Sequence, residues 1–263
     1  MVEITGYAAS ILIGLSLGLI GGGGSILTVP ILVYFFYVDP VLASTYSLFV
    51  VGITSSVGAF SHYQKGNVNF KLAFLFGIPS LVSVFTMRKW IMPMIPFDLF
   101  TIGSFELTKP TLLMLTFAAL MIVAAFSMIR NTNRKLVAYN PVNYIKLVVQ
   151  SIVVGIITGF VGVGGGFLII PSLVIFAKLP MKMAVGTSLM IMTLSSLLGV
   201  LGDVSRHEPI DYMFLSSFSA FAIIGILVGS YLTRYIQENK LRPAFGWFVL
   251  VMGIFVLITT LKL

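Results

Sequence analysis

Long apolar runs, separated by short polar segments, dominate the hydrophobic pattern of this chain. A helix needs about 20 apolar residues to cross the ~30 Å hydrocarbon core of a bilayer. Six runs have this length and predict membrane-crossing helices, at 42–61, 70–87, 110–129, 183–202, 212–233 and 243–261. The segment from Trp90 to Lys109 contains two prolines and a glycine, and we predict that it is a loop on the membrane surface.

Two further runs are too long for a single crossing. Ile4 to Val38 is uncharged over 35 residues, and Leu147 to Ala177 over 31. Straight helices of these lengths would extend about 52 and about 46 Å. Glycines interrupt both runs, as Gly21-Gly22-Gly23-Gly24 and as Gly162-Val163-Gly164-Gly165-Gly166. Consecutive glycines lower helix propensity and permit positive φ, so we predict that each run breaks and folds back as two shorter helices.

The two broken runs are also copies of each other. At a constant offset of 141, residues 18–58 align with 159–199 without a gap, and 14 of the 41 positions are identical. The identities include the glycines of the breaks and the proline that follows each break. The chain is therefore predicted to be a tandem duplication, with a first membrane repeat at 1–130, a linker at 131–141 and a second membrane repeat at 142–263.

Composition excludes most other classes of protein. Hydrophobic residues make up 58% of the chain and charged residues 9%, against roughly a quarter charged in an average soluble domain. This excludes a soluble enzyme, a nucleic-acid-binding module and a disordered chain, and it predicts an all-α, polytopic membrane bundle surrounded by lipid. The absence of cysteine excludes a disulfide framework and a thiolate metal site, and no metal or other cofactor is predicted.

The charges predict how the halves are oriented. If each broken run crosses once, giving eight spans, the 16 basic residues divide 8 to 8 between the two sides. If each broken run returns to its own side, giving ten segments, they divide 11 to 5. The positive-inside rule favours the second arrangement, with Asn133 and Lys178 in the cytoplasm and Glu3 and Asp203 outside. Halves of five segments each must be inverted relative to one another, which is a transporter architecture.

The glycine breaks are the candidate binding site. A helix that begins inside the membrane leaves about four N–H groups unpaired and carries about half a positive charge at its N-terminus. Two such ends, pointing to a common centre, would bind an anion without lysine or arginine, and the sequence shows no basic residue near either break. The expected ligands are the backbone N–H groups of Gly23, Gly24, Ser25, Gly164, Gly165 and Gly166. The alternative is that these glycines only allow close helix packing.

Hydroxyl side chains follow each break. We expect Ser47, Thr187 and Ser188 to complete the shell around the anion, and Ser47 and Ser188 coincide in the repeat alignment. Alternatively, these hydroxyls bond to their own helix backbone, as serine and threonine commonly do in membrane helices. His62 aligns with Asp203 and is a candidate proton-linked group, although a cap at the end of its helix is the favoured interpretation.

The motifs resemble those of the TauE/SafE family of sulfite and sulfonate permeases. The resemblance rests on Gly18-x-x-Gly21-x-Gly23-Gly24 and its copy Gly159-x-x-Gly162-x-Gly164-Gly165-Gly166, each followed by a proline. It also rests on Ala184-Val185-Gly186-Thr187-Ser188-Leu189 and on His62-x-x-x-Gly66-Asn67-Val68-Asn69. It covers nearly the whole chain and implies transport of a small sulfur-containing anion across a prokaryotic inner membrane.

The function that these observations favour is a transporter for sulfite or an organosulfonate. It would work by alternating access, with the anion bound at half-helix N-termini near the midplane. A passive anion channel is the nearest alternative, and an intramembrane enzyme is more distant. The sequence leaves open the exact substrate, the direction of transport, the coupling ion and the oligomeric state.

Overall fold

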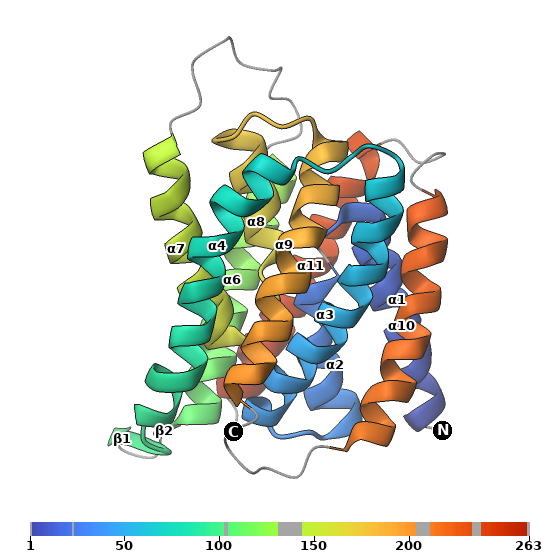
Figure 1. The fold of residues 1–263 in the computed structure, drawn as a ribbon. Helices are drawn as coiled ribbons and strands as arrows, with labels where there is room; N and C mark the ends of the chain where they lie inside the picture. Colours follow the sequence, from blue (N-terminus) through green and yellow to red (C-terminus); the bar gives the residue numbers. More distant parts are fainter. Residues whose placement is uncertain are drawn as a thin grey trace.

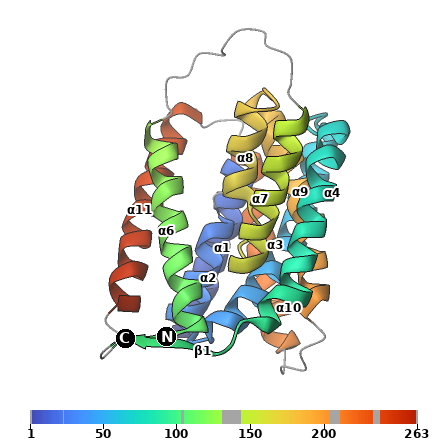
Figure 2. The same cartoon turned by 90° about the vertical axis from the view of Figure 1, so that its left-hand side faces the viewer.

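The computed structural model describes residues 2–22, 24–102, 105–130, 144–203, 211–232 and 238–261, which form a bundle of helices with one small hairpin (Figures 1 and 2). The first half contributes α1 (Val2–Ile20), α2 (Ser25–Phe36), α3 (Pro40–Gln64), α4 (Phe70–Thr86), the π-helical turn η1 (Met87–Ile91), α5 (Met92–Met94), β1 (Asp98–Ile102), β2 (Phe105–Thr108) and α6 (Lys109–Arg130). The second half contributes α7 (Tyr144–Val161), α8 (Gly166–Ile175), α9 (Met181–Asp203), α10 (Tyr212–Leu232) and α11 (Glu238–Leu261). The predicted linker at 131–141 lies outside the described residues.

The expected polytopic membrane bundle is confirmed. Within the described ranges, six helices are long and apolar enough to cross a membrane: Pro40–Gln64, Phe70–Met94, Lys109–Phe126, Tyr144–Val161, Met181–Asp203 and Tyr212–Leu232. The apolar part of α11, Gly246–Leu261, is shorter. All six runs predicted to cross the membrane lie in helices, so the protein is an integral membrane protein.

Both over-long runs break at their glycines and turn back, as predicted. α1 ends at Ile20 and α2 begins at Ser25, whereas α7 ends at Val161 and α8 begins at Gly166. A methyl group on Gly24 would overlap the Ile13 carbonyl, so the start of α2 lies beside the middle of α1. Each broken run therefore returns to the face of the bundle from which it entered, the lower face in Figure 1 for α1 and α2 and the upper face for α7 and α8.

The segment after α4 corrects the predicted surface loop. The helix continues through η1 and α5, and a two-stranded antiparallel hairpin follows, with Asp98 opposite Thr108 and Ile102 opposite Phe105. Pro93 lies in the first turn of α5, where a missing backbone N–H breaks no helical hydrogen bond. The aromatic and β-branched residues that follow favour strands, so the prolines do not make the whole segment irregular.

The helices pack as pairs that join the two halves. α1 packs along α10, α4 along α7 and α3 along α9, while α6 and α11 form a fourth pair at one side of the bundle (Figure 2). α3 and α9 also contact α10 and α4, respectively, and so occupy the centre. Every one of these pairs takes one helix from each half, so neither half buries its apolar surface alone.

Individual contacts also occur in matched sets. Gly14 of α1 lies against Ala222 of α10, and Gly155 of α7 lies against Ser80 of α4. Gly14 and Gly155 match at the offset of 141. Ala222 and Ser80 match at an offset of 142, because the alignment shifts by one residue before Val68-Asn69-Phe70 and Ile210-Asp211-Tyr212. The two contacts are therefore equivalent in the two repeats. In these two helix pairs the glycines allow backbones to approach closely, as small residues do in membranes. Packing therefore accounts for the glycines inside α1 and α7.

Candidate functional site

The two glycine breaks meet each other. A methyl group on Gly22 would overlap the backbone of Gly166, and one on Gly166 would lie 2.6 Å from the Cα of Gly22. Only residues without a side chain allow two backbones to approach this closely. The ends of α2 and α8 that carry the N-terminal dipoles therefore lie at a common centre, which is the arrangement on which the sequence-based site depends.

The backbone at the breaks is that of tight turns rather than of packed helices. Gly21 has a φ of 80°, and Gly162, Gly164 and Gly165 have φ values of 79°, 69° and 73°. These values lie in the left-handed region, which favours glycine. The N-cap residues Gly24 and Gly165 have no side chain that could accept a hydrogen bond from the helices they precede. No N-cap side chain therefore competes with an anion for the N–H groups of the first turns.

The middle of the central helix pair, α3 and α9, lies at the same level of the bundle as the glycine breaks. Thr45 of α3 donates a hydrogen bond to Asp203 of α9 at one end. His62 of α3 lies beside Gly186 of α9 at the other end. The two helices run antiparallel, so their midpoints fall near Thr54-Ser55 and Ser195-Ser196. These serines and this threonine therefore lie at the middle of two helices long and apolar enough to cross a membrane.

Two of these hydroxyls are equivalent in the repeats and have no hydrogen-bond partner among the described residues. Ser55 and Ser196 occupy matching positions at the offset of 141, and both are fully buried. A Cβ atom on Gly164 would lie 3.1 Å from Ser196 Oγ, so this hydroxyl borders the second break. Thr158 Oγ1, beside Gly165, is also buried without a described partner. Such groups are costly to bury unless something bonds to them.

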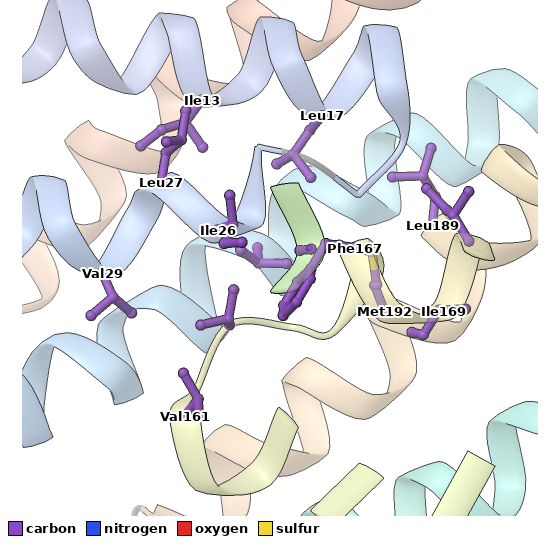
Figure 3. Close-up of a cluster of buried hydrophobic side chains, with 14 of the residues drawn as sticks. Ile13, Leu17, Ile26, Leu27, Val29, Val161, Phe167, Ile169, Leu189 and Met192 are labelled. Carbon is purple, nitrogen blue, oxygen red and sulfur yellow. The ribbon is translucent and has the colours of Figure 1, made fainter. Parts of the chain in front are cut away.

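Apolar side chains surround the breaks. Figure 3 shows Leu17 of α1, Ile26 of α2, Phe167 of α8 and Met192 of α9 among the buried cluster around the two turns. All four are nearly or fully inaccessible. An apolar wall lowers the local dielectric constant and so strengthens the attraction between an anion and the helix N-termini.

The structure brings together most of the predicted backbone ligands. Gly164, Gly165 and Gly166 all lie in the second break, and Gly166 contacts the first break through Gly22. Gly24 is the N-cap of α2, but its Cα faces α1, so a side chain there would disturb the packing of α1 and α2. Gly23 lies outside the described residues.

The predicted hydroxyls differ in what they already bond. Ser25 donates to the Gly22 carbonyl, and Ser188 donates to the Val185 carbonyl. A hydroxyl has one proton to donate, so neither can also donate to an anion in this conformation. Ser47 Oγ is buried with no partner in the described part of the chain.

Thr187 has a structural role that the duplication makes recognisable. Its hydroxyl accepts from the backbone N–H of Asn69, which caps α4. At the equivalent place in the other half, the Tyr46 hydroxyl accepts from the backbone N–H of Asp211, which caps α10. Thr187 and Tyr46 each hold the start of a helix from the other repeat.

His62 does not cap its helix. It is 4% exposed, and neither ring nitrogen has a hydrogen-bond partner among the described residues. The carbonyl groups at the end of α3 instead accept from the backbone N–H groups of Gly66 and Asn67. The favoured interpretation of His62 as an interfacial cap is therefore wrong, and a buried imidazole remains as a candidate functional group.

A buried basic residue lies beside the second break, contrary to the expectation from sequence. Arg88 of η1 is fully buried, its Nη1 lies 2.8 Å from Asp203 Oδ2, and a methyl group on Gly162 would overlap its Nη2. Asp203 is itself only 5% exposed, so both charges of this pair are buried. Arg88 and Gly162 are 74 residues apart and lie in different repeats, so the sequence does not reveal their contact.

Sequence reasoning undervalued Gly22, Ser55 and Ser196. For the two serines the duplication contained the signal, whereas Gly22 aligns with Val163 and is not repeated. The pair Ser55 and Ser196 is identical at the offset of 141, as are Ser47 and Ser188. Spacing alone could not decide which pair has free hydroxyls. That depends on whether each hydroxyl bonds to its own helix.

Six helices long and apolar enough to cross a membrane, together with two runs that break at glycines and turn back, are the architecture of a membrane transporter. The chain belongs to the TauE/SafE sulfite exporter family, because the family model described as "Sulfite exporter TauE/SafE" matches residues 7–256. It is 29% identical over 253 residues to a "Probable membrane transporter protein" of Xylella fastidiosa (strain 9a5c), covering 94% of this chain and 91% of the relative. The family and its relatives are transporters and not enzymes.

More distant organisms have similar proteins. A probable membrane transporter protein of Bacillus subtilis is 27% identical over 236 residues, covering 89% of this chain and 91% of the relative. One of Methanocaldococcus jannaschii is 27% identical over 266 residues, covering 94% of each chain. No solved structure matches this chain.

Proposed function

We propose that this protein transports a small sulfur-containing anion, sulfite or an organosulfonate, across a prokaryotic inner membrane. The observation that carries the proposal is the direct contact between Gly22 and Gly166. It brings two helix N-termini to one mid-membrane centre, where together they offer about one unit of positive charge. That charge can offset one anionic charge without binding the anion as tightly as a buried lysine would. The family description supports the choice of sulfite.

The shell around the anion consists of backbone N–H groups and unpartnered hydroxyls. We assign the backbone role to Gly23, Gly24, Ser25, Gly164, Gly165 and Gly166, as the sequence predicts. The hydroxyl donors are Ser55 and Ser196, because their protons are not used by the described residues. Ser47 lies eight residues, slightly more than two turns, before Ser55 on the same side of α3 and lines the path to the site. Thr187 and Ser188 stabilise the backbone around this shell, through hydrogen bonds to Asn69 and Val185 respectively.

We infer that the two halves are inverted repeats and that the cycle is alternating access. Matched contacts across the helix pairs support this inference, as do the opposite directions in which α1 and α7 enter the bundle (Figure 1). Inverted halves around a shared midplane site are the arrangement that opens alternately to either side. The driving force would be the anion gradient or a proton carried on the substrate, since sulfite itself titrates near neutral pH.

The test uses the purified full-length protein in liposomes with labelled sulfite and methanesulfonate. Replacing Ser55 or Ser196 with alanine removes one hydrogen bond to a charged group, worth about 1.5–3 kcal/mol. Each variant should bind the anion about tenfold more weakly or worse. Ser56→Ala is the matched control, because Ser56 is the neighbour of Ser55 and donates to its own backbone at Ile53.

Three outcomes would contradict the proposal. Equal affinity in Ser55→Ala, Ser196→Ala and Ser56→Ala would place the site elsewhere. A loss confined to Ser188→Ala would return the donor role to the residue that the sequence favours. Flux that never accumulates anion against its gradient, under any imposed ion gradient, would indicate a passive channel instead of a transporter.

A further inference from the structure

An arginine and an aspartate are buried together beside the second glycine break. Arg88 Nη1 lies 2.8 Å from Asp203 Oδ2, and the two side chains are 0% and 3% exposed. Thr45 donates to the same carboxylate oxygen at 2.8 Å, and Arg88 Nη1 donates to Ser44 Oγ at 3.0 Å. The guanidinium also lies against Gly162, at the turn that leads from α7 toward α8.

The local backbone directs this arginine inward. Arg88 lies in the π-helical turn η1, where Met87 and Arg88 are buried and Lys89 and Trp90 are exposed. A π-helical turn shifts the register of the side chains along a helix and occurs frequently at functional sites. Two adjacent basic residues thus have opposite surroundings, one inside the bundle and one at its surface.

Stability alone explains this pair poorly. Removing two charges from water costs free energy that their mutual attraction often does not recover, and apolar residues of similar volume are often as stable. Ionisable groups inside a membrane protein therefore commonly mark the path of a substrate or ion. Here the pair lies next to the break that carries the anion site.

We propose that Arg88 is an anion-contacting residue at this end of the pathway, and that the oxyanion displaces Asp203 from it. The proposal rests on the proposed function. A guanidinium presents a planar fork of N–H donors that matches the oxygens of an oxyanion, and here one of those donors, Nη1, is bonded to Asp203 Oδ2. On displacement, Ser44 still holds the guanidinium and Thr45 still holds the carboxylate, so each charge retains a hydroxyl partner.

The test compares sulfite affinity in variants that should change it in opposite directions. Arg88→Gln should raise the Kd about tenfold or more, because it removes a charged donor. Asp203→Asn should lower the Kd about tenfold, because it removes the carboxylate with which the anion competes and leaves a buried positive charge that the anion can neutralise. Lys89→Gln is the matched control, since Lys89 is the exposed neighbour, and its Kd should not change.

A purely structural ion pair gives a different pattern. Arg88→Gln and Asp203→Asn would then both unfold at lower temperature, with the same Kd as the unaltered protein, and this result overturns the proposal. If Asp203→Asn does not yield folded protein, Arg88→Lys decides. It keeps the charge pair but loses the fork, so weaker sulfite binding supports the proposal and unchanged binding overturns it.

Failure of this inference is distinguishable from failure of the proposed function. If Ser55→Ala and Ser196→Ala weaken sulfite binding but the variants at Arg88 and Asp203 leave the Kd unchanged, only the role of Arg88 is lost. If the unaltered protein binds neither sulfite nor methanesulfonate, the proposed function is wrong.

Discussion

The two ends of the central helix pair have equivalent positions in the duplication but different chemistry. At one end, Asp203 near the end of α9 is paired with Arg88 and accepts from Thr45. We call this the Arg88 end; it is the lower end in Figure 1, where α4 runs toward β1. At the opposite, upper end, which we call the His62 end, His62 occupies the position that aligns with Asp203. Lys65 there donates to the Ser230 carbonyl.

This difference would make the proposed transport cycle asymmetric, although the helix pairs are matched between the two halves. Opening the Arg88 end requires two buried charges to separate, whereas the described contacts of His62 include no ion pair. Separating buried charges is costly unless another charge replaces one of them. If Arg88 contacts the anion as proposed, the Arg88 end is the one whose opening depends on the anion. The His62 end is held by packing and by hydrogen bonds such as that from Lys65 to the Ser230 carbonyl.

The largest expected effect concerns which end faces the cytoplasm. The predicted excess of basic residues places the His62 end inside. Tyr37 is exposed near the Arg88 end, and Gln64 is exposed near the His62 end. In this cysteine-free chain, a single cysteine at position 37 should react fully with an impermeant maleimide added to intact cells. A cysteine at position 64 should react only after permeabilisation.

The reverse labelling pattern would invert the comparison and place Arg88 at the cytoplasmic end. A cysteine at Lys178 provides a second probe of the His62 face, since the link between α8 and α9 lies there (Figure 1). Labelling of position 178 from outside, together with protection of position 64, would restore the eight-span arrangement. Asn133, the other predicted cytoplasmic position, lies outside the described residues.

The next largest effect is on stability. Arg88→Met should lower the free energy of unfolding by about 3–5 kcal/mol, because it leaves Asp203 as a buried charge without its cation. At the His62 end, His62→Leu should cost less than about 1 kcal/mol, because no described ion pair is broken. Both values can be measured from denaturant unfolding in detergent micelles, followed by the fluorescence of Trp90 and Trp247.

A double substitution separates the charge from the packing. Arg88→Met combined with Asp203→Leu should recover most of the lost stability, because neither charge then remains buried. The stable double variant should nevertheless bind sulfite poorly if Arg88 contacts the anion. A double variant as unstable as Arg88→Met alone would show that the shape of this cluster, and not its charge, holds the Arg88 end together.

Much of the fold could be predicted from the sequence, because its signals are local and repeated. A glycine cluster inside a run that is too long to cross once leaves few alternatives to a break, and the same cluster occurs again at the offset of 141. The hairpin between β1 and β2 was missed because Pro93 and Pro96 indicate irregular structure. Their positions before the first strand decide the outcome, and composition does not contain that information.

The chemistry of the site was only partly predictable. The repeat alignment selects Ser55 and Ser196 as readily as Ser47 and Ser188, and only the structure shows that Ser188 uses its proton on Val185. Arg88 follows an apolar run, where a basic residue normally anchors a helix at the membrane surface. Its burial depends on Asp203, 115 residues away, and no local pattern predicts such a partner.

The smallest expected effect concerns His62. Histidine is the side chain that ordinarily gains or loses its charge between pH 5 and 8. When the His62 end opens to water, a protonated imidazole would add positive charge on the path of the anion. Flux of methanesulfonate, which stays ionised throughout this range, should therefore rise about fivefold between pH 8 and pH 5.5, equivalent to roughly 1 kcal/mol. His62→Gln should remove this rise, because the amide stays neutral.

Methanesulfonate is the necessary substrate here, because the protonation of sulfite would itself change flux over the same range. Tyr63→Phe is the matched control; Tyr63 is exposed beside His62, and its removal leaves the imidazole in place. A rise of the same size in the unaltered protein and in His62→Gln would show that His62 takes up no proton during transport. The two ends would then differ only in how firmly they close, and the coupling would come from the anion gradient or from the substrate's own proton.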